Sequence, residues 1–161
     1  SIGINRNDFM SLIQINDNRP DDIKAIQWLS FASNAFNVMV PFYADIETTP
    51  DYLSNTTGEV STDNFYWSSR MIAAMADASY KKSIFHIERY QEHVLSKGHE
   101  IINRYDDMIQ NEADTDKHLA LKHEANQAVA DMLKAATSDT LGKVLYELSN
   151  EMKNAYSRSD A

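Results

Sequence analysis

The chain has 161 residues, with 15 basic and 24 acidic side chains, a formal net charge of −9 and no cysteine. The length suits one domain or one large piece of a bigger domain, and a hydrophobic fraction of 43% excludes global disorder. The acidic balance disfavours nucleic acid as a partner, because phosphate binding needs a basic surface. The missing cysteine excludes disulfide scaffolds, thiolate zinc sites and a cysteine nucleophile within these residues.

The sequence carries no sign of a membrane or secretory segment. No stretch approaches the roughly 20 consecutive apolar residues of a membrane span, so no membrane partner is expected. The first residues lack the positive charge and apolar block of a secretory signal. We therefore expect a soluble, cytoplasmic protein.

The first part of the chain predicts strands. Residues 9–15 are mostly apolar on both faces, which is typical of a buried strand. A polar turn is expected over residues 16–22. Residues 23–33 predict a second strand, with Ile26 and Trp28 on one face.

A third extended stretch covers residues 38–44. Pro41 lies inside it, and because proline has no N–H to donate, an edge strand, a bulge or an irregular stretch is expected there. A loop is expected over residues 45–60, which contain several Thr, Asn and Gly residues.

After Ser61 the hydrophobic period becomes helical. Ser61, Thr62 or Asp63 is expected to cap the start of a helix. Apolar residues then recur at helical steps for roughly 50 residues, which predicts one long helix, or two helices with a break near residues 79–83. Gly98 lies inside this pattern, so a kink at that position is an open alternative.

The last part of the chain predicts further helices. A polar, acidic turn is expected over residues 111–117. The pattern then predicts a helix over residues 119–136 and another that Ser138 or Asp139 caps. The tail from Ser157 onward is expected to fray.

Strands followed by helices indicate an α+β fold. We expect a strand-rich segment over residues 1–60, contributing to a larger sheet, and a helical segment over residues 61–161. Two or three strands that are apolar on both faces cannot cover themselves. The pattern therefore favours one incomplete domain.

The five histidines and the acidic pairs do not predict a metal or cofactor site. His86 and His93 are seven residues apart, or about 10 Å along a helix, and His118 and His123 point away from each other. No HExxH or ExxH motif occurs, and no glycine-rich phosphate loop or nucleophile elbow is present. Acidic pairs such as residues 106–107 are interpreted as charged side chains on the solvent-exposed surface. No metal and no cofactor are expected.

A dense group of polar and aromatic residues opens the helical segment. Asn64, Trp67 and Arg70 follow one another at three-residue steps, so they project from neighbouring parts of one helix face. Arg70 can hold a carboxylate bidentately, and Asn64 can donate to an oxyanion. The alternative is purely structural: a helix cap and an aromatic core, with Arg70 paired to Asp63 or Asp77.

Three ordered strings in the sequence resemble the dipeptidase A family of cysteine dipeptidases. They are AIQWLSFASNAFNVMVPFYA at residues 25–44, TPDYL at residues 49–53 and STDNFYW at residues 61–67. The similarity continues through IERYQ at residues 87–91. The resemblance implies an N-terminal-nucleophile hydrolase with a four-layer αββα fold. It also implies that a cysteine at the mature N-terminus attacks the dipeptide carbonyl while its own α-amine acts as base.

In complete family members these strings belong to the C-terminal third. The resemblance therefore implies that the chain is a C-terminal fragment of a dipeptidase. Its partners would be the remainder of the same polypeptide, which holds the nucleophile, and the dipeptide substrate. Alone, the fragment should have no peptidase activity. A free-standing α+β protein-interaction or assembly domain without catalysis is the alternative, and a homo-oligomer is compatible with either.

Related acylases carry a Ser-Arg-apolar step at a helix start, where the arginine lies beside the nucleophile. Residues 69–71 (Ser-Arg-Met) are similar to that step. The resemblance implies that Arg70 reaches the active site, where it holds the nucleophile's environment or the substrate carboxylate. It gives Asn64 a polar positioning role. Trp28 and Trp67 are expected to pack in the core instead.

Overall fold

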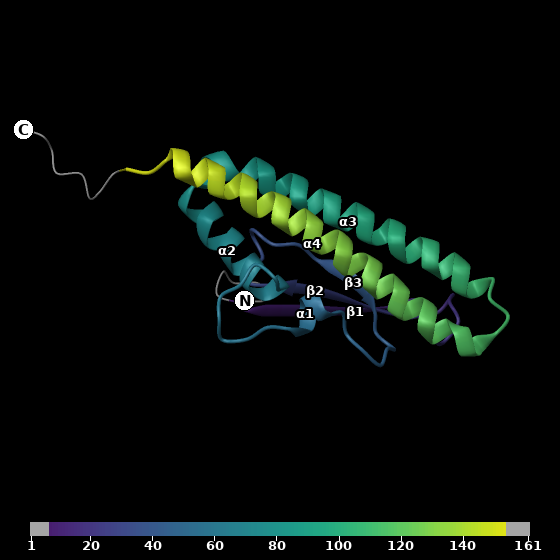
Figure 1. Ribbon diagram of the computed structural model, residues 1–161. Helices are drawn as coiled ribbons and strands as arrows, with labels where there is room; N and C mark the ends of the chain where they lie inside the picture. The colour runs from purple at the N-terminus through teal and green to yellow at the C-terminus, as the bar shows by residue number, and fades with distance from the viewer. Residues whose placement is uncertain (1–6, 154–161) are drawn as a thin grey trace, which may run out of the picture.

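The computed structural model of the chain describes residues 7–153 and confirms the α+β fold class. Within these residues, three strands are followed by the helices (Figure 1). The elements are β1 (Phe9–Ile15), β2 (Ala25–Phe31), β3 (Val40–Tyr43), α1 (Asp51–Ser54), α2 (Phe65–Ala78), α3 (Tyr80–Gln110), the short 3₁₀ helix η1 (Thr115–Lys117) and α4 (His118–Asn150). The two long helices, α3 and α4, run antiparallel and side by side along one side of the sheet.

The three strands form an antiparallel sheet in the order β1-β2-β3. The predicted strand over residues 9–15 is confirmed, and β2 lies inside the predicted range. Pro41 of β3 lies opposite Trp28 of β2. Because β3 is an outer strand of this sheet, the edge-strand prediction is confirmed too. Because β3 needs no second strand on its outer side, proline is tolerated there.

The prediction that residues 9–15 form a buried strand is wrong for the described chain. Phe9, Leu12, Ile13 and Ile15 are between 52% and 63% exposed. The reason is that, within residues 7–153, β1 packs against β2 alone. The helices cover β3 and one face of β2 but do not reach β1.

The helical segment begins with α2, and Asn64 caps it. The Asn64 side-chain oxygen accepts from the Trp67 N–H at 2.8 Å, so the prediction of a cap at residues 61–63 is wrong by one position. A break between two helices is confirmed: α2 ends at Ala78, Ser79 leaves helical geometry, and α3 begins at Tyr80.

Gly98 allows α3 to pack closely against β3. The helix runs through it without interruption. A Cβ atom at this position would lie 2.7 Å from Cδ and 3.0 Å from Cγ of Pro41. Only glycine lets the helix backbone come this near the proline ring.

The prediction of two helices after residue 118 is wrong, because α4 is a single helix of 33 residues. The stripe of buried residues continues past Ser138 through Thr140 and Val144. The Thr140 hydroxyl donates to the Ala136 carbonyl at 2.9 Å, inside the helix. A serine or aspartate ends a helix only where its side-chain hydrogen bond to the backbone replaces the backbone hydrogen bonds of the helix. The predicted fraying from Ser157 lies outside the described residues.

The expected loop over residues 45–60 contains one helical turn, α1. Its Tyr52 side chain is buried and pins the turn to the core. Ser54 closes the turn by donating to the Pro50 carbonyl at 3.2 Å. Burial of a single aromatic side chain explains why this short helix forms in a stretch rich in turn residues.

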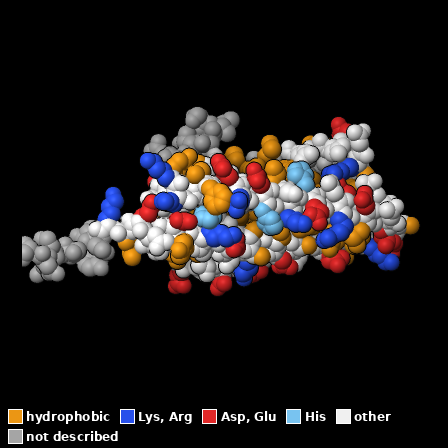
Figure 2. Space-filling view, turned by 90° about the horizontal axis from the view of Figure 1, so that it is seen from above, with side chains coloured by type: hydrophobic (Ala, Val, Ile, Leu, Met, Phe, Trp, Pro, Cys, Tyr) orange, Lys and Arg blue, Asp and Glu red, His pale blue; other side chains and the backbone are white. Residues whose placement is uncertain are grey.

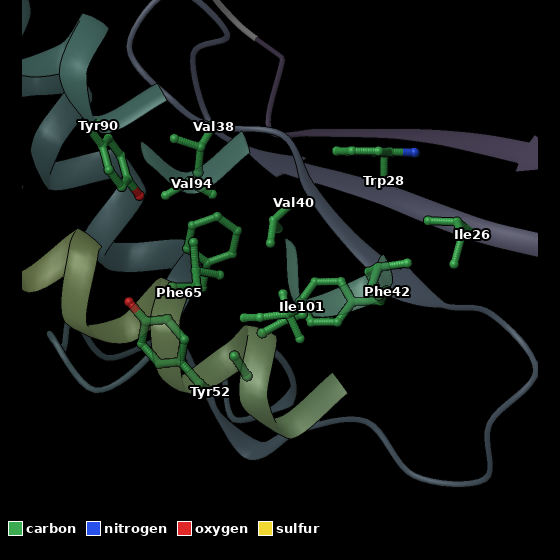
Figure 3. Close-up of a cluster of buried hydrophobic side chains, with 14 of the residues drawn as sticks. Ile26, Trp28, Val38, Val40, Phe42, Tyr52, Phe65, Tyr90, Val94 and Ile101 are labelled. Carbon is green, nitrogen blue, oxygen red and sulfur yellow. The ribbon is translucent and has the colours of Figure 1, made fainter. Parts of the chain in front are cut away.

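The core lies between β3, the inner face of β2 and the helices (Figure 3). Its side chains come from both the strand-rich and the helical segments, among them Ile26, Trp28, Val38, Val40, Phe42, Tyr52, Phe65, Tyr90, Val94 and Ile101. Strands and helices thus share one core. None of the helices in residues 7–153 is both long and apolar enough for a membrane span.

Candidate functional site

A cavity of about 610 Å³ lies where the residues directly before β1, the loop after β2 and α2 meet. We call it the Arg70 pocket. Its polar and aromatic lining includes Asp8, Ser33, Tyr66, Trp67, Arg70 and Asp77. This lining holds one guanidinium, two carboxylates and aromatic rings, and no histidine of residues 7–153 takes part in it.

Arg70 is held at the pocket by two neighbours. Its guanidinium forms an ion pair with the Asp8 carboxylate and lies 5.6 Å from the centre of the Tyr66 ring. The expected pairing of Arg70 with Asp63 or Asp77 is wrong. Asp8 lies directly before β1 and within reach of the Arg70 side chain on α2, although 62 residues separate the two in sequence. With a side chain 44% exposed, Arg70 keeps donors available to a ligand.

Asn64 does not line the pocket. It is 3% exposed, and its amide oxygen is occupied by the cap on α2. The structure therefore brings Trp67 and Arg70 to one cavity and leaves Asn64 beneath it, at the base of the helix that carries both. Any influence of Asn64 on the pocket would act through the first turn of α2.

The two tryptophans have different surroundings. Trp28 is in the core, as expected, and its ring N–H donates to the Gln14 side chain at 2.9 Å. Trp67 is only half-buried and lines the Arg70 pocket, so its expected place in the core is wrong. Its ring N–H donates to the Thr57 carbonyl at 2.9 Å, which fixes the ring as a wall of the cavity.

The loop after β2 was missed as a functional candidate. Ala32 has a positive φ of 61°, which is uncommon for a residue with a side chain. The side-chain oxygens of Ser33, Asn34 and Asn37, and of Ser69 on α2, are buried with no hydrogen-bond partner in residues 7–153. Unpaired buried polar atoms and backbone strain gather at functional sites. The only signal in the sequence was a Ser-Asn pair directly after a strand.

His118, the first residue of α4, does not line the Arg70 pocket and has a structural role. Its two ring nitrogens lie 2.9 Å from the Glu112 carbonyl oxygen and 2.6 Å from the Asp22 carboxylate. Both neighbours are acceptors, so both ring nitrogens must donate, which only the imidazolium can do. The Glu112 carbonyl and the Asp22 carboxylate therefore raise the pKa of His118 above its usual value.

Asp106 is buried, so its interpretation as solvated charge is wrong. The Tyr43 hydroxyl donates to it at 2.6 Å, and the Arg19 guanidinium pairs with its other oxygen at 2.5 Å. Burial raises the pKa of Asp106, while Tyr43 and Arg19 oppose that rise. Burial also raises the pKa of Tyr43. This group ties the end of β3 to α3 and to the turn after β1.

The outer face of α3 and α4 carries basic side chains interspersed with acidic ones and histidines (Figure 2). His86 lies 3.2 Å from the Glu147 carboxylate, and the Lys143 ammonium 2.6 Å from Asp139. Among residues 7–153 no group of three or more metal-binding side chains is close enough to hold an ion. His86 and Lys143 on this face are thus each paired with an acidic side chain of α4.

Comparison with known proteins gives consistent results. The model of Peptidase family C69 matches residues 1–93, which include all the residues that line the Arg70 pocket. "Probable dipeptidase A" of Streptococcus pyogenes serotype M3 is 39% identical over 159 residues, covering 99% of this chain and 33% of the relative. "Dipeptidase" of Bifidobacterium longum is 36% identical over 197 residues, covering 99% of this chain and 37% of the relative. "Dipeptidase A" of Lactobacillus helveticus is 31% identical over 149 residues, 91% of this chain and 30% of the relative.

The chain thus spans about a third of the length of the curated relatives it matches. The family match covers more than half of the chain and includes the sheet, α2 and the pocket. On that ground the chain belongs to Peptidase family C69.

Proposed function

We propose that this chain is the C-terminal part of a dipeptidase and that the Arg70 pocket forms one wall of its substrate site. One observation carries the proposal: relatives named as dipeptidases match 99% of the chain, and the family match contains the whole lining of the pocket. The charges in that lining suit a small substrate that carries a carboxylate.

The nucleophile is proposed to be a cysteine at the mature N-terminus of the complete polypeptide, outside these 161 residues, which contain no cysteine. Its thiolate would add to the dipeptide carbonyl, the peptide C–N bond would break, and the α-amine would pass a proton to the leaving amine. Water would then hydrolyse the acyl-enzyme. The share of the relatives that the chain spans, about a third, supports this division of the reaction.

In this proposal Arg70 contacts the substrate or the surroundings of the nucleophile. The guanidinium has five donors in a planar fork, and Asp8 occupies only part of them. A substrate carboxylate could therefore bind beside Asp8 without displacing it. Asn64 is proposed as a positioning residue, because its cap on the first turn of α2 sets the direction of the helix that carries Trp67 and Arg70.

The test uses the complete polypeptide that contains this chain. Arg70→Ala should lower kcat/KM for dipeptide hydrolysis about 100-fold, since a charge-assisted contact to the substrate is lost. Arg70→Lys keeps the charge but not the fork, and should recover only part of the activity. Arg89→Ala is the matched control, because Arg89 is exposed on α3 and lies against the Phe85 ring, away from the pocket.

Unchanged dipeptide hydrolysis in Arg70→Ala would contradict the assignment of the pocket. The chain of 161 residues alone should hydrolyse no dipeptide, and any activity above a no-protein control would contradict the placement of the nucleophile. Unfolding midpoints of all three variants should match that of the unaltered protein, so that a folding defect is told apart from lost contact.

The exposed apolar surface of β1 favours a second candidate, a free-standing interaction or assembly domain without catalysis. The reading frame upstream of Ser1 distinguishes the two. A segment led by cysteine well upstream supports the dipeptidase. A start codon directly before Ser1 would favour the interaction domain.

A further inference from the structure

Asp77 lies on the same wall of the Arg70 pocket as Arg70 itself. The two residues are seven positions apart on α2, which returns them to the same face of the helix about 10 Å apart along its axis. Asp77 is exposed, and no ion pair to it occurs among residues 7–153. The wall therefore presents a cation at one position and an anion two helical turns further on.

Small side chains separate these charges. Ala73 and Ala74 line the pocket between Arg70 and Asp77, and Phe36 lines it from the loop after β2. No larger side chain of α2 stands between the guanidinium and the carboxylate along this wall. A ligand can thus lie along α2 over a short apolar surface, with one end at each charge.

The spacing matches a zwitterion of dipeptide length. Two extended residues span at most about 7 Å, and a hydrogen bond at each end adds about 2.8 Å. The sum is on the order of the separation between the two charged residues of the wall. A tripeptide is about 3.4 Å longer and therefore fits this separation less well.

We propose that Asp77 binds the free α-ammonium group of a dipeptide while Arg70 binds its α-carboxylate, so that this wall selects zwitterionic dipeptides by length and charge. This inference rests on the proposed function and names the substrate contacts of the same pocket. It makes Asp77 a specificity-determining residue.

The experiment compares three substrates in the complete polypeptide: a dipeptide, its N-acetyl derivative and a tripeptide with the same scissile bond. The unaltered enzyme should prefer the free dipeptide. Asp77→Asn should lower kcat/KM for the dipeptide about 10- to 100-fold, mainly through KM, because a charge-assisted contact to the ground state and the transition state is lost. The rate with the N-acetyl dipeptide should change little, so Asp77→Asn should largely lose the preference for the free dipeptide over the N-acetyl derivative.

The matched control is Glu88→Gln, which removes an exposed carboxylate on α3 that does not line the pocket. It should leave the preference intact. Asp77→Glu keeps the charge and should restore part of the preference. Recovery by Asp77→Glu separates lost charge from damage to the helix.

The pH dependence of KM provides a second measurement that a structural defect would not imitate. An α-ammonium group loses its proton near pH 8. The KM of the unaltered enzyme for the dipeptide should therefore rise above that pH, and the rise should be smaller in Asp77→Asn.

The outcomes separate the two proposals. If the unaltered polypeptide cleaves no dipeptide, the proposed function fails and this inference fails with it. If it cleaves dipeptides but Asp77→Asn retains the full preference for a free α-amine, this inference alone is overturned.

Discussion

The two edges of the three-stranded sheet have opposite surroundings. All four residues of β3 are buried, and the Asn126 side chain of α4 satisfies the outer backbone groups of Tyr43. The Asn126 amide oxygen accepts from the Tyr43 N–H at 2.8 Å, and the amide nitrogen donates to the Tyr43 carbonyl at 3.1 Å. The other edge, β1, exposes apolar side chains, and within residues 7–153 it has no partner but β2.

An edge strand leaves a row of donors and acceptors that something must satisfy. Within residues 7–153, α4 does so for Tyr43 of β3, and no helix does so for β1. Asp8, directly before β1, is the residue that holds Arg70. A segment of the complete polypeptide that covered β1 would therefore also approach the proposed substrate site. The contrast between the edges supports the proposal that these residues are one part of a larger domain.

The largest expected loss of stability comes from removing the side chain that pairs with the backbone of β3, the covered edge of the sheet. Asn126→Leu removes both hydrogen bonds to Tyr43 and leaves two buried backbone groups unpaired, at a cost of about 2–5 kcal/mol in the free energy of unfolding. Urea denaturation measures it. Gln127→Ala, on the exposed side of the same helix, should change stability by less than about 0.5 kcal/mol. Equal effects of the two variants would contradict the role of Asn126.

A smaller effect is expected where α3 meets β3. Gly98→Ala places a Cβ 2.7 Å from the Pro41 ring and should destabilise the chain by about 1–2 kcal/mol, because overpacking outweighs the gain in helix propensity. Gly142→Ala on α4 meets no atom within 4 Å and should stabilise it by about 0.5–1 kcal/mol. The two thermal unfolding midpoints should move in opposite directions. A shift upward for both would show that the approach of Gly98 to Pro41 is not tight.

The turn that joins the open strand to β2 should respond to pH. Asp22 in this turn pairs with His118 of α4, and the pKa of His118 is raised in the folded state. The pair contributes its full stability below the unfolded-state pKa of about 6.5 and loses it as pH rises through the higher folded-state pKa. His118→Gln should remove this loss of stability between pH 6 and pH 9. Urea midpoints across that range check it, and an unaltered pH slope in the variant would contradict it.

The smallest effect is expected at the open edge. Ile13→Lys should change the stability of this chain by less than about 0.5 kcal/mol, because Ile13 is 52% exposed. Val40→Ala, in the closed edge strand, should cost about 2 kcal/mol. The chain should also bind a hydrophobic dye or self-associate through β1, and Ile13→Lys should weaken both. A stable monomer that binds no dye would contradict the open edge.

Several features followed from local pattern. The apolar run over residues 9–15 predicted the bounds of β1 to the residue, and the change of period after Ser61 placed the helical segment. A break near residues 79–83 was one of the two alternatives that the apolar spacing left open, and the structure has it at Ser79. These features depend on neighbours within one or two turns, which is the range over which hydrophobic periodicity and turn residues act.

Features that join distant parts of the chain did not follow from pattern. The sequence alone determined the α+β order of elements and the strings that resemble a dipeptidase family, and it singled out Arg70 as a candidate site residue. Only the tertiary structure decided that Asp8 holds Arg70 across 62 residues, that Asn126 closes β3 across 83 residues, and that α4 continues through Ser138. The physical reason is that a side chain's partner depends on which elements pack together. A local preference such as a helix cap yields when the buried face of the helix continues beyond it.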